Sequence, residues 1–381
     1  MGLSKTIWAS PSEFIRAQQP GNPVMFFAPS VLQATARRFL DGFPGLVTYA
    51  VKSNPDEAVI ENLVAAGLKG FDVASPFEID LIARLAPGAA MHYNNPVRSR
   101  AEIAFALEHG VRSFSVDSHS ELRKLAAIAP AAGTEVSVRF KLPVQGSAYN
   151  FGAKFGATVE DAALILREAA DLGFTPSLTF HPGTQVNDVT LWDQFIRAAA
   201  GIARAAGVRI ARLNTGGGFP SHRTEGDRLT LEEIFATIGR ATDEAFGDDR
   251  PALVCEPGRG MCAEAFSVAA CVKAVRDDRD VFLNDGTYGT LFEMPITGMT
   301  DRITVISPDG QHRAGAPKPW PVFGPTCDSV DRLPGEPVLP ADIAEGDYVV
   351  FAGLGAYSVV TNTRFNGFGE LAMATVLSLR V

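Results

Sequence analysis

The feature that most constrains the fold of this chain is a regular alternation of short apolar runs and amphipathic stretches. Eight runs have the length and residue types of strands, and seven stretches with helical periodicity separate them. Alternation of this kind is typical of parallel strands joined by helical crossovers, and eight such units favour closure into a barrel. The expected strands are residues 47–51, 70–74, 90–93, 113–116, 135–140, 177–181, 210–214 and 252–255.

The sequence therefore predicts an α/β protein with a (β/α)8, TIM-like barrel over residues 29–262. An open Rossmann sheet is the alternative fold. Its glycine fingerprint should follow the first strand, where this chain has Lys52 and Ser53 instead.

After Arg259 the pattern changes to β-branched or alternating segments with Gly/Pro-rich turns and no long amphipathic helix. This predicts a second, mostly antiparallel β-domain over residues 263–381. The apolar run at 24–28 lies in an N-terminal segment, residues 1–28, that we expect to join the β-domain, with the barrel inserted between.

Charge and composition exclude several partners. The 34 basic residues are scattered and the net charge is −9, so nucleic acid is not expected to bind. No apolar run approaches the roughly 20 residues that span a bilayer, so no membrane association is expected. The four cysteines lack zinc-site spacing, and a reduced, cytoplasmic compartment fits them best.

Polar residues stand at the carboxyl ends of the expected barrel strands, where barrel enzymes carry their chemistry. They are Lys52, Asp72, Asn94, Asn95, Asp117, Arg139, His181, Gly216, Gly217, Gly218, Glu256 and Arg259. So many polar groups on one rim predict a functional site there.

Four of these features favour pyridoxal 5′-phosphate. Gly216–Gly218 and Arg259 suit a phosphate, because glycines let backbone N–H groups approach an anion. The carboxylate of Glu256 suits a protonated pyridine nitrogen, and His181 suits stacking on a flat ring. Lys52 supplies an amine that can form an imine with an aldehyde. A metal hydrolase is the competing class, but it would need several histidines and only His181 is well placed, so no metal is expected.

Motifs spread over nearly the whole chain resemble the fold-III pyridoxal-phosphate decarboxylases that act on ornithine, lysine, arginine or diaminopimelate. The resemblance is greatest to the ornithine/lysine branch, and it implies a barrel of the alanine racemase type. The matching segments are 49–54, 71–75, 154–156, 180–181, 216–220, 256–259, 285–286, 324–328, 355–357 and 365–368.

The resemblance implies roles for individual residues. Lys52 would carry the cofactor, His181 would stack on its ring and Glu256 would pair with its pyridine nitrogen. The phosphate and the rest of the cofactor would contact Thr184, Gly217, Gly218, Gly258, Arg259 and Tyr357, with Asp72, Glu78 and Arg139 as pocket-lining residues.

The resemblance also implies a homodimer with shared active sites. Cys327 would deliver a proton to the product in the neighbouring subunit's site, and Asp328 would bind the distal amine of the substrate. The ornithine branch has a second acidic residue for that amine at the position of Thr297, and Glu293 is a candidate substitute here. Asn214 likewise replaces an acidic residue of the family.

These departures put the substrate in doubt. Ornithine or lysine, decarboxylated to a diamine in polyamine biosynthesis, is the first expectation. There are three alternatives. The substrate is a diamino acid modified on its distal nitrogen, as in siderophore or polyamine precursors; or it is diaminopimelate; or the protein is an amino-acid racemase on the same fold. A racemase would need a second base opposite Lys52, and segment 324–328 argues for the decarboxylase. A non-catalytic regulator would tend to lose Lys52 or Cys327, and both are present.

Overall fold

The computed structural model of the chain describes residues 6–143, 154–221, 229–298 and 301–381. Contacts group the described residues into two compact units. One falls within residues 35–220 and 226–260, and the other falls within residues 1–34, 221–225 and 261–381.

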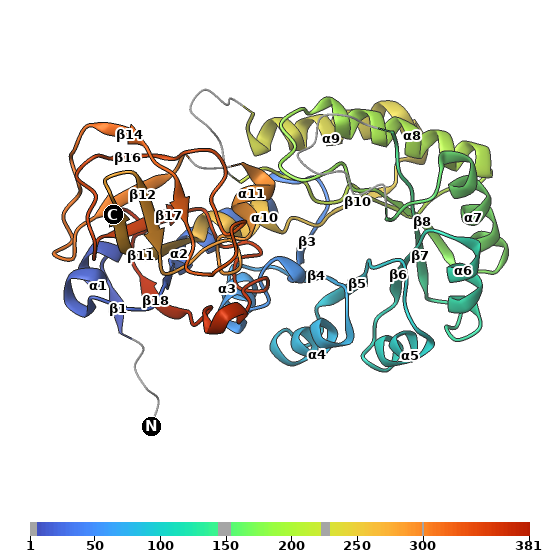
Figure 1. Cartoon of the computed structure of the whole chain (residues 1–381). Helices are drawn as coiled ribbons and strands as arrows, with labels where there is room; N and C mark the ends of the chain where they lie inside the picture. Colours follow the sequence, from blue (N-terminus) through green and yellow to red (C-terminus); the bar gives the residue numbers. More distant parts are fainter. Residues whose placement is uncertain (1–5, 144–153, 222–228, 299–300) are drawn as a thin grey trace. The chain divides into compact units, whose positions relative to one another are not determined.

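The first unit is a closed barrel of eight parallel strands in the order β10-β3-β4-β5-β6-β7-β8-β9, which confirms the predicted (β/α)8 fold (Figure 1). Each strand pairs with the strand that precedes it in sequence, and β10 closes the barrel by pairing Val254 with Leu46. The strands are β3 (Leu46–Ala50), β4 (Gly70–Val73), β5 (Ala90–Tyr93), β6 (Ser113–Val116), β7 (Glu135–Arg139), β8 (Thr175–Thr179), β9 (Arg212–Asn214) and β10 (Ala252–Cys255).

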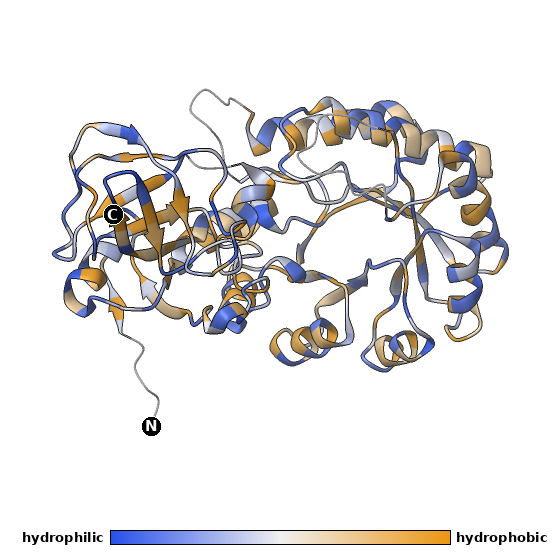
Figure 2. Cartoon of the chain, viewed as in Figure 1, coloured by the Kyte–Doolittle hydropathy of each residue, from blue (hydrophilic) through white to orange (hydrophobic). Residues whose placement is uncertain are grey.

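Helices alternate with these strands, and hydrophilic and hydrophobic residues alternate along them as the amphipathic pattern predicts (Figure 2). They are α2 (Pro29–Gly42), α3 (Glu57–Ala65), α4 (Pro76–Leu85), α5 (Arg100–Glu108), α6 (His119–Ala126), α7 (Val159–Asp171), α8 (Thr190–Ala206) and α9 (Leu231–Phe246). Side chains of Ser75, Ser99, Ser118 and Thr230 each accept a hydrogen bond from the backbone N–H three residues later. These caps begin the helices directly after the loops that carry the site.

The ends of the expected barrel strands differ from the observed ends by up to two residues, and one of these differences moves a site residue. The sequence predicts a strand to His181, whereas β8 ends at Thr179, because its partner β7 ends at Arg139, opposite Thr179. His181 therefore lies in the loop that follows the strand.

The second unit contains an eight-stranded sheet with the path β1-β18-β2-β11-β12-β15, extended by β17 and β13. Its strands are β1 (Ile7–Trp8), β2 (Val24–Phe27), β11 (Phe266–Arg276), β12 (Asp280–Leu283), β13 (Ile303–Ile306), β15 (Val322–Phe323), β17 (Tyr348–Ala352) and β18 (Ala372–Val376). A separate pair joins β14 (Pro317–Pro319) and β16 (Val338–Pro340). The helices of this unit are α1 (Pro11–Gln18), α10 (Arg259–Cys262, which begins in the barrel unit) and α11 (Glu293–Thr297).

The N-terminal strand β2 lies inside this sheet, between β18 and β11. Antiparallel pairing holds around β11 and β17, as expected, but β18 pairs parallel with both β1 and β2. One face of the sheet buries Val24, Phe26, Ala269 and Val350 together with Ile15 of α1. The sheet is therefore mixed, with its two chain ends side by side.

Over the part of the chain that the structure describes, none of the helices combines the length and the hydrophobicity that crossing a bilayer requires.

Candidate active site

Lys52 and Asp72 form an ion pair at the carboxyl ends of β3 and β4. Lys52 lies in a single 3-10 turn, Val51–Ser53, and its Nζ is 3.2 Å from Oδ2 of Asp72. Asp72 is buried, whereas 44% of the Lys52 side chain is exposed. Oδ1 of Asp72 has no hydrogen-bond partner among the described residues. A buried carboxylate oxygen without a protein partner needs an explanation, and a bound group that contacts this oxygen would supply one.

Hydrogen bonds stabilise the turn that holds Lys52. Ser53 Oγ donates to the carbonyl of Ala50 at 2.7 Å, and Tyr49 Oη donates to the carbonyl of Asn54 at 3.0 Å. The N–H of Ala50 donates to the carbonyl of Pro257 at 3.1 Å, which ties the turn to the loop after β10. The lysine stem thus leaves a rigid part of the barrel.

Glu256 follows β10, and its side chain is buried. Two side-chain amides donate hydrogen bonds to the same carboxylate oxygen. Asn94 and Asn214 donate to Oε2 from 2.7 and 2.9 Å. Burial and the nearby Asp72 raise the pKa of Glu256 to about 7, and Lys52, the Asn214 hydrogen bond and Arg139 oppose that rise. Neither amide donates to Oε1, so this oxygen could accept a hydrogen bond from a protonated ring nitrogen.

His181 lies in the loop after β8 with its Nδ1 accepting the N–H of Gly183 at 3.2 Å. Burial, with smaller contributions from Arg139 and Lys52, lowers its pKa well below the ordinary value. The imidazole is therefore neutral at neutral pH and carries its proton on Nε2. A neutral flat ring can lie against another aromatic ring without a desolvated charge.

The three glycines after β9 are packed too closely for side chains. A Cβ on Gly216 would lie 2.2 Å from the carbonyl oxygen of Phe180, and one on Gly217 would lie 3.0 Å from His181 Nε2 and from the Glu256 carbonyl oxygen. Gly216 and Gly218 have φ of +72° and +84°, where only glycine is free of strain. The glycine loop therefore packs directly against the loops that follow β8 and β10.

Arg139 and Glu78 complete the charges of the barrel site. Arg139 ends β7, and the carboxylates of Glu256, Asp72 and Asp117 counteract the lowering of its pKa by burial. Glu78 accepts the N–H of Ala74 at 2.7 Å in the first turn of α4. Burial raises the pKa of Glu78 to about 7, and Asp72 adds to the rise.

The structure brings several of the predicted barrel residues together. Lys52, Asp72, Arg139, His181 and Glu256 interact electrostatically with one another. Gly258 belongs to the same end of the barrel, where a Cβ on it would lie 3.1 Å from Ser53 Cβ. Half-buried Thr184 follows Gly183, and the buried Arg259 begins α10.

The sequence interpretation assigned no role to Asn94 and treated Asn214 as a departure. In the structure both hold Glu256. Their position at strand ends was the available signal, because the carboxyl ends of all eight strands meet at one rim.

The remaining predicted residues lie in the second unit. Cys327 is exposed, and its N–H donates to Asn366 Oδ1 at 3.0 Å. Asp328 accepts the Tyr288 hydroxyl at 2.5 Å on Oδ2 and the N–H of Val330 at 3.1 Å on Oδ1. The Tyr288 hydrogen bond holds the pKa of Asp328 below its ordinary value, so it is a carboxylate at neutral pH.

A buried aspartate organises the loop that carries these two residues. The Asp331 carboxylate accepts hydrogen bonds from the backbone N–H and the hydroxyl of both Thr287 and Thr326, over 2.8 to 3.1 Å. Gly286 and Gly324 pack against it, since a Cβ on either would lie 2.2 Å from Asp331 Oδ1. The segments 285–290 and 324–331 are therefore one structural element.

The candidates for a second amine-binding residue differ in environment. Thr297 Oγ1 donates to the carbonyl of Glu293 at 2.8 Å, so its hydroxyl is used within α11. Glu293 is buried in the first turn of the same helix. Tyr357, predicted to contact phosphate, lies after β17 with a left-handed backbone, φ 63°.

The barrel residues fit pyridoxal 5′-phosphate. The unsatisfied Oδ1 of Asp72 offers a hydrogen-bond acceptor, the accessible Lys52 amine offers an aldehyde-reactive group, and neutral His181 offers a ring contact on the same rim. The described residues contain no group of three or more His, Cys, Asp or Glu that could hold a metal ion.

Comparison with known proteins gives consistent matches. Residues 30–263 match the family model described as pyridoxal-dependent decarboxylase, pyridoxal binding domain. The ornithine decarboxylase of Mus musculus is 31% identical over 369 residues, which cover 90% of this chain and 77% of that protein. The lysine/ornithine decarboxylase of Selenomonas ruminantium is 32% identical over 84% of this chain and 81% of its own length. The solved arginine decarboxylase of Paramecium bursaria Chlorella virus superposes with a TM-score of 0.85 at 25% identity, covering 95% of this chain and 98% of that one.

Proposed function

The chain belongs to the pyridoxal-dependent decarboxylase family, and from this premise we propose that it converts a basic L-amino acid, ornithine or lysine, to the corresponding diamine. The protein is a decarboxylase that uses pyridoxal 5′-phosphate. When bound, this cofactor takes up the electron pair released as the substrate's carboxylate departs.

The observation that carries the choice of substrate is the state of Asp328. Asp328 is a carboxylate at neutral pH, the Tyr288 hydroxyl that donates to it lowers its pKa further, and its side chain is half-buried beside Cys327. An ionised acceptor in that position suits a distal ammonium group on the substrate. Neutral or acidic amino acids would leave it unpaired.

In the barrel, we assign binding and proton roles to the residues already described. Lys52 would hold the cofactor through its aldehyde, and Asp72 is the counter-ion of the amine in the free protein. Glu256 would accept a hydrogen bond from the protonated ring nitrogen, and neutral His181 would lie against the ring. Thr184, Gly217, Gly218, Gly258 and Arg259, together with Tyr357, would hold the phosphate.

Proton delivery and substrate binding involve a second copy of the chain in this proposal. Cys327 Sγ gives a proton to the substrate carbon that has lost its carboxylate, and Asp328 binds the distal amine. Cys327 is exposed within its own chain, which leaves its thiol accessible to a second copy. Two copies related by a two-fold axis would share both sites.

Release of carbon dioxide tests the proposal. Purified protein saturated with pyridoxal 5′-phosphate is incubated with L-ornithine, L-lysine, L-arginine, meso-diaminopimelate and acyl- or carboxyl-modified diamino acids. The highest kcat/KM is expected with ornithine or lysine. Carbon dioxide from none of the basic amino acids would overturn the substrate proposal, and loss of optical activity without carbon dioxide would indicate a racemase.

A modified diamino acid is the second candidate, and one contact favours it. Thr297 is uncharged and its hydroxyl donates to the Glu293 carbonyl of its own helix, so this position adds no negative charge to the distal-amine site. A distal nitrogen that carries a carboxyl or acyl group would need fewer carboxylates around it. The same panel of amino acids distinguishes the two candidates. A higher kcat/KM with ornithine or lysine supports the first, and a higher kcat/KM with a modified diamino acid supports the second.

A further inference from the structure

Glu256 is held from two sides of the barrel by amides that contact the same oxygen. Asn94 follows β5 and Asn214 ends β9, and their Nδ2 atoms lie 2.7 and 2.9 Å from Oε2. All three side chains are buried. In the closed barrel β9 is next to β10, whereas β5 is separated from β10 by β3 and β4. The Asn94 contact therefore crosses the barrel mouth.

The orientation of each amide is determined by a donor on its other side. The Ser115 hydroxyl donates to Oδ1 of Asn94 at 2.9 Å, and the backbone N–H of Gly216 donates to Oδ1 of Asn214 at 2.9 Å. A backbone N–H cannot accept, so the Asn214 amide cannot turn round without losing this bond. Both NH2 groups consequently point at Glu256.

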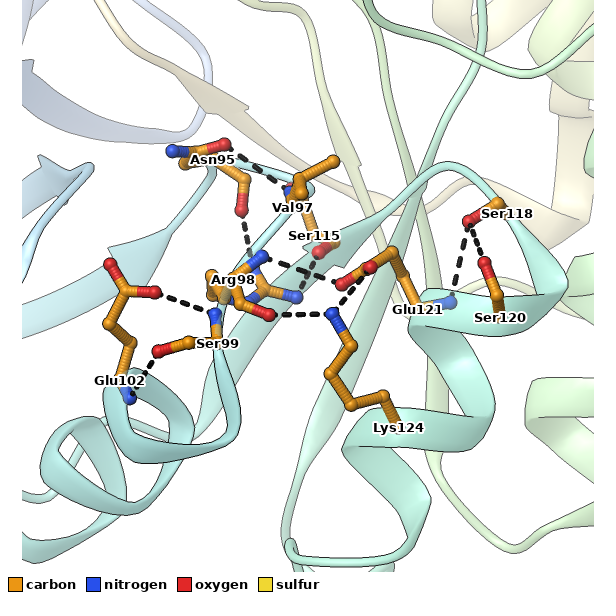
Figure 3. Close-up of polar contacts among 10 residues, drawn as sticks. All are labelled: Asn95, Val97, Arg98, Ser99, Glu102, Ser115, Ser118, Ser120, Glu121 and Lys124. Atoms are coloured by element: carbon orange, nitrogen blue, oxygen red, sulfur yellow. Dashed lines mark hydrogen bonds and ion pairs between the residues drawn. The ribbon is translucent and has the colours of Figure 1, made fainter.

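Arg98 fixes the backbone on which Asn94 and Ser115 stand. Its guanidinium donates to the carbonyls of Tyr93 and Asn95, on either side of Asn94, at 3.1 and 2.6 Å, and to the carbonyl of Ser115 at 2.5 Å. Figure 3 shows the Arg98 side chain directed at Asn95 and Ser115. Burial lowers the pKa of Arg98 to about 10, so it remains charged at neutral pH.

A second layer holds Arg98 in turn. Lys124 Nζ donates to the carbonyl of Arg98 and to Glu121 Oε1, both at 2.6 Å, and Glu121 Oε2 accepts the N–H of Arg98 (Figure 3). The guanidinium also lies 5.1 Å from the centre of the Tyr93 ring. The loop after β5 is thus locked to β6 and α6.

We propose that Asn94 and Asn214 are positioning residues that keep Glu256 a carboxylate and reserve its Oε1 for the ring nitrogen of pyridoxal 5′-phosphate, with Ser115 and Arg98 holding Asn94 as a donor. An oxygen that receives two N–H donors cannot also carry a proton toward either of them. Any proton exchanged with the ring nitrogen must therefore use Oε1. This inference rests on the role proposed for Glu256.

Electrostatics explain why such donors are needed. Burial raises the pKa of Glu256 and so favours the protonated acid, and the charge of Asp72 on β4 raises it further. Lys52 after β3 and Arg139 on β7 oppose this rise in pKa. The Asn214 hydrogen bond also opposes it, and the resulting pKa of about 7 leaves Glu256 balanced between its two states near neutral pH. Without hydrogen-bond donors to the charged form, this balance would move further toward the protonated acid. A protonated Glu256 could not accept the ring proton.

The test replaces Asn94 by leucine, which has a similar volume and no donor. The protonation of Glu256 is followed against pH in the cofactor-free, full-length protein by the infrared band of its carboxyl group, assigned with Glu256→Gln. We expect Asn94→Leu to raise the apparent pKa by about one unit, a tenfold change in the protonated-to-ionised ratio. Asn95→Ala is the matched control, because its side chain contacts Val97 N–H and not Glu256, and it should titrate like the wild type.

Cofactor affinity gives a second measurement. Asn94→Leu should bind pyridoxal 5′-phosphate roughly tenfold more weakly at neutral pH and recover as the pH rises and Glu256 ionises. An unchanged titration together with unchanged affinity would overturn the proposal. If Asn94→Leu does not fold, Ser115→Ala is measured in its place. The apparent pKa of Glu256 is then expected to rise, and an unchanged pKa would overturn the proposal. The titration needs no substrate, so it separates this inference from the choice of amino acid.

Discussion

Lys52 Nζ and Asp72 Oδ2 lie 3.2 Å apart at the ends of two adjacent barrel strands, where an accessible ammonium meets a buried carboxylate. The register of β3 and β4 places Ala50 opposite Asp72, so the turn after Ala50 carries the lysine over the carboxylate. The carboxylate retains one unsatisfied oxygen. This pair keeps the amine at the barrel mouth before any ligand arrives.

Borohydride should therefore attach a pyridoxyl group to Lys52. In protein saturated with pyridoxal 5′-phosphate, reduction followed by peptide mass mapping is expected to place the adduct on the peptide that contains residue 52. Lys52→Ala should give no adduct there, whereas Lys69→Ala, at an exposed lysine before β4, should react like the wild type. An adduct that persists elsewhere in Lys52→Ala at full yield would show that the wrong amine had been chosen.

Tyr288→Phe should weaken substrate binding more than it slows turnover. Loss of the hydroxyl removes the hydrogen bond that lowers the Asp328 pKa, so that pKa rises toward its ordinary value. The carboxylate is present above its pKa and lost as the pH falls through it, so the variant should lose affinity at a higher pH than the wild type. We expect KM for the diamino acid to rise roughly tenfold on the acidic side, measured by initial rates against pH. A variant that lowers kcat at constant KM would contradict this role.

Cys327→Ala should slow turnover without loss of the cofactor, because the thiol lies in the β-domain unit and the Lys52 amine lies in the barrel. Mixing Cys327→Ala with Lys52→Ala should then restore activity. Each mixed dimer would contain one intact site, so random exchange should give roughly a quarter of wild-type activity. Activity measured after subunit exchange checks this, and no recovery in verified mixed dimers would place both residues in one chain's site.

Glu78→Gln should change how stability depends on pH. Burial raises the pKa of Glu78 from 4.5 to about 7, so between these values the folded chain holds a proton that the unfolded chain has released. The wild type should lose stability over this range as the pH rises, by at most about 3 kcal/mol from this group, and then level off. Glutamine can still accept the Ala74 N–H but does not titrate. Urea midpoints of the cofactor-free proteins should diverge from pH 4.5 to 7.5 in favour of the variant, and parallel curves would contradict the assignment.

Local sequence determined the barrel. Strand runs, helical periodicity and cap residues such as Ser75 and Thr230 act over a few neighbouring residues, so the eight expected barrel strands lie within two residues of their observed ends. The site residues on the rim followed, because parallel strands bring their carboxyl ends to one edge. Lys52, Asp72, His181 and Glu256 were named on that ground.

Tertiary structure alone decided which of these groups touch. Asn94 and Glu256 are 162 residues apart in sequence, and only closure of the barrel brings their side chains to 2.7 Å. Likewise the parallel pairing of β18 with β2 joins the two ends of the chain, and nothing local in either strand selects that neighbour. Periodicity and capping depend on residues a few positions apart, whereas strand order, hydrogen-bond partners and pKa values depend on burial among distant segments, which only the folded chain defines.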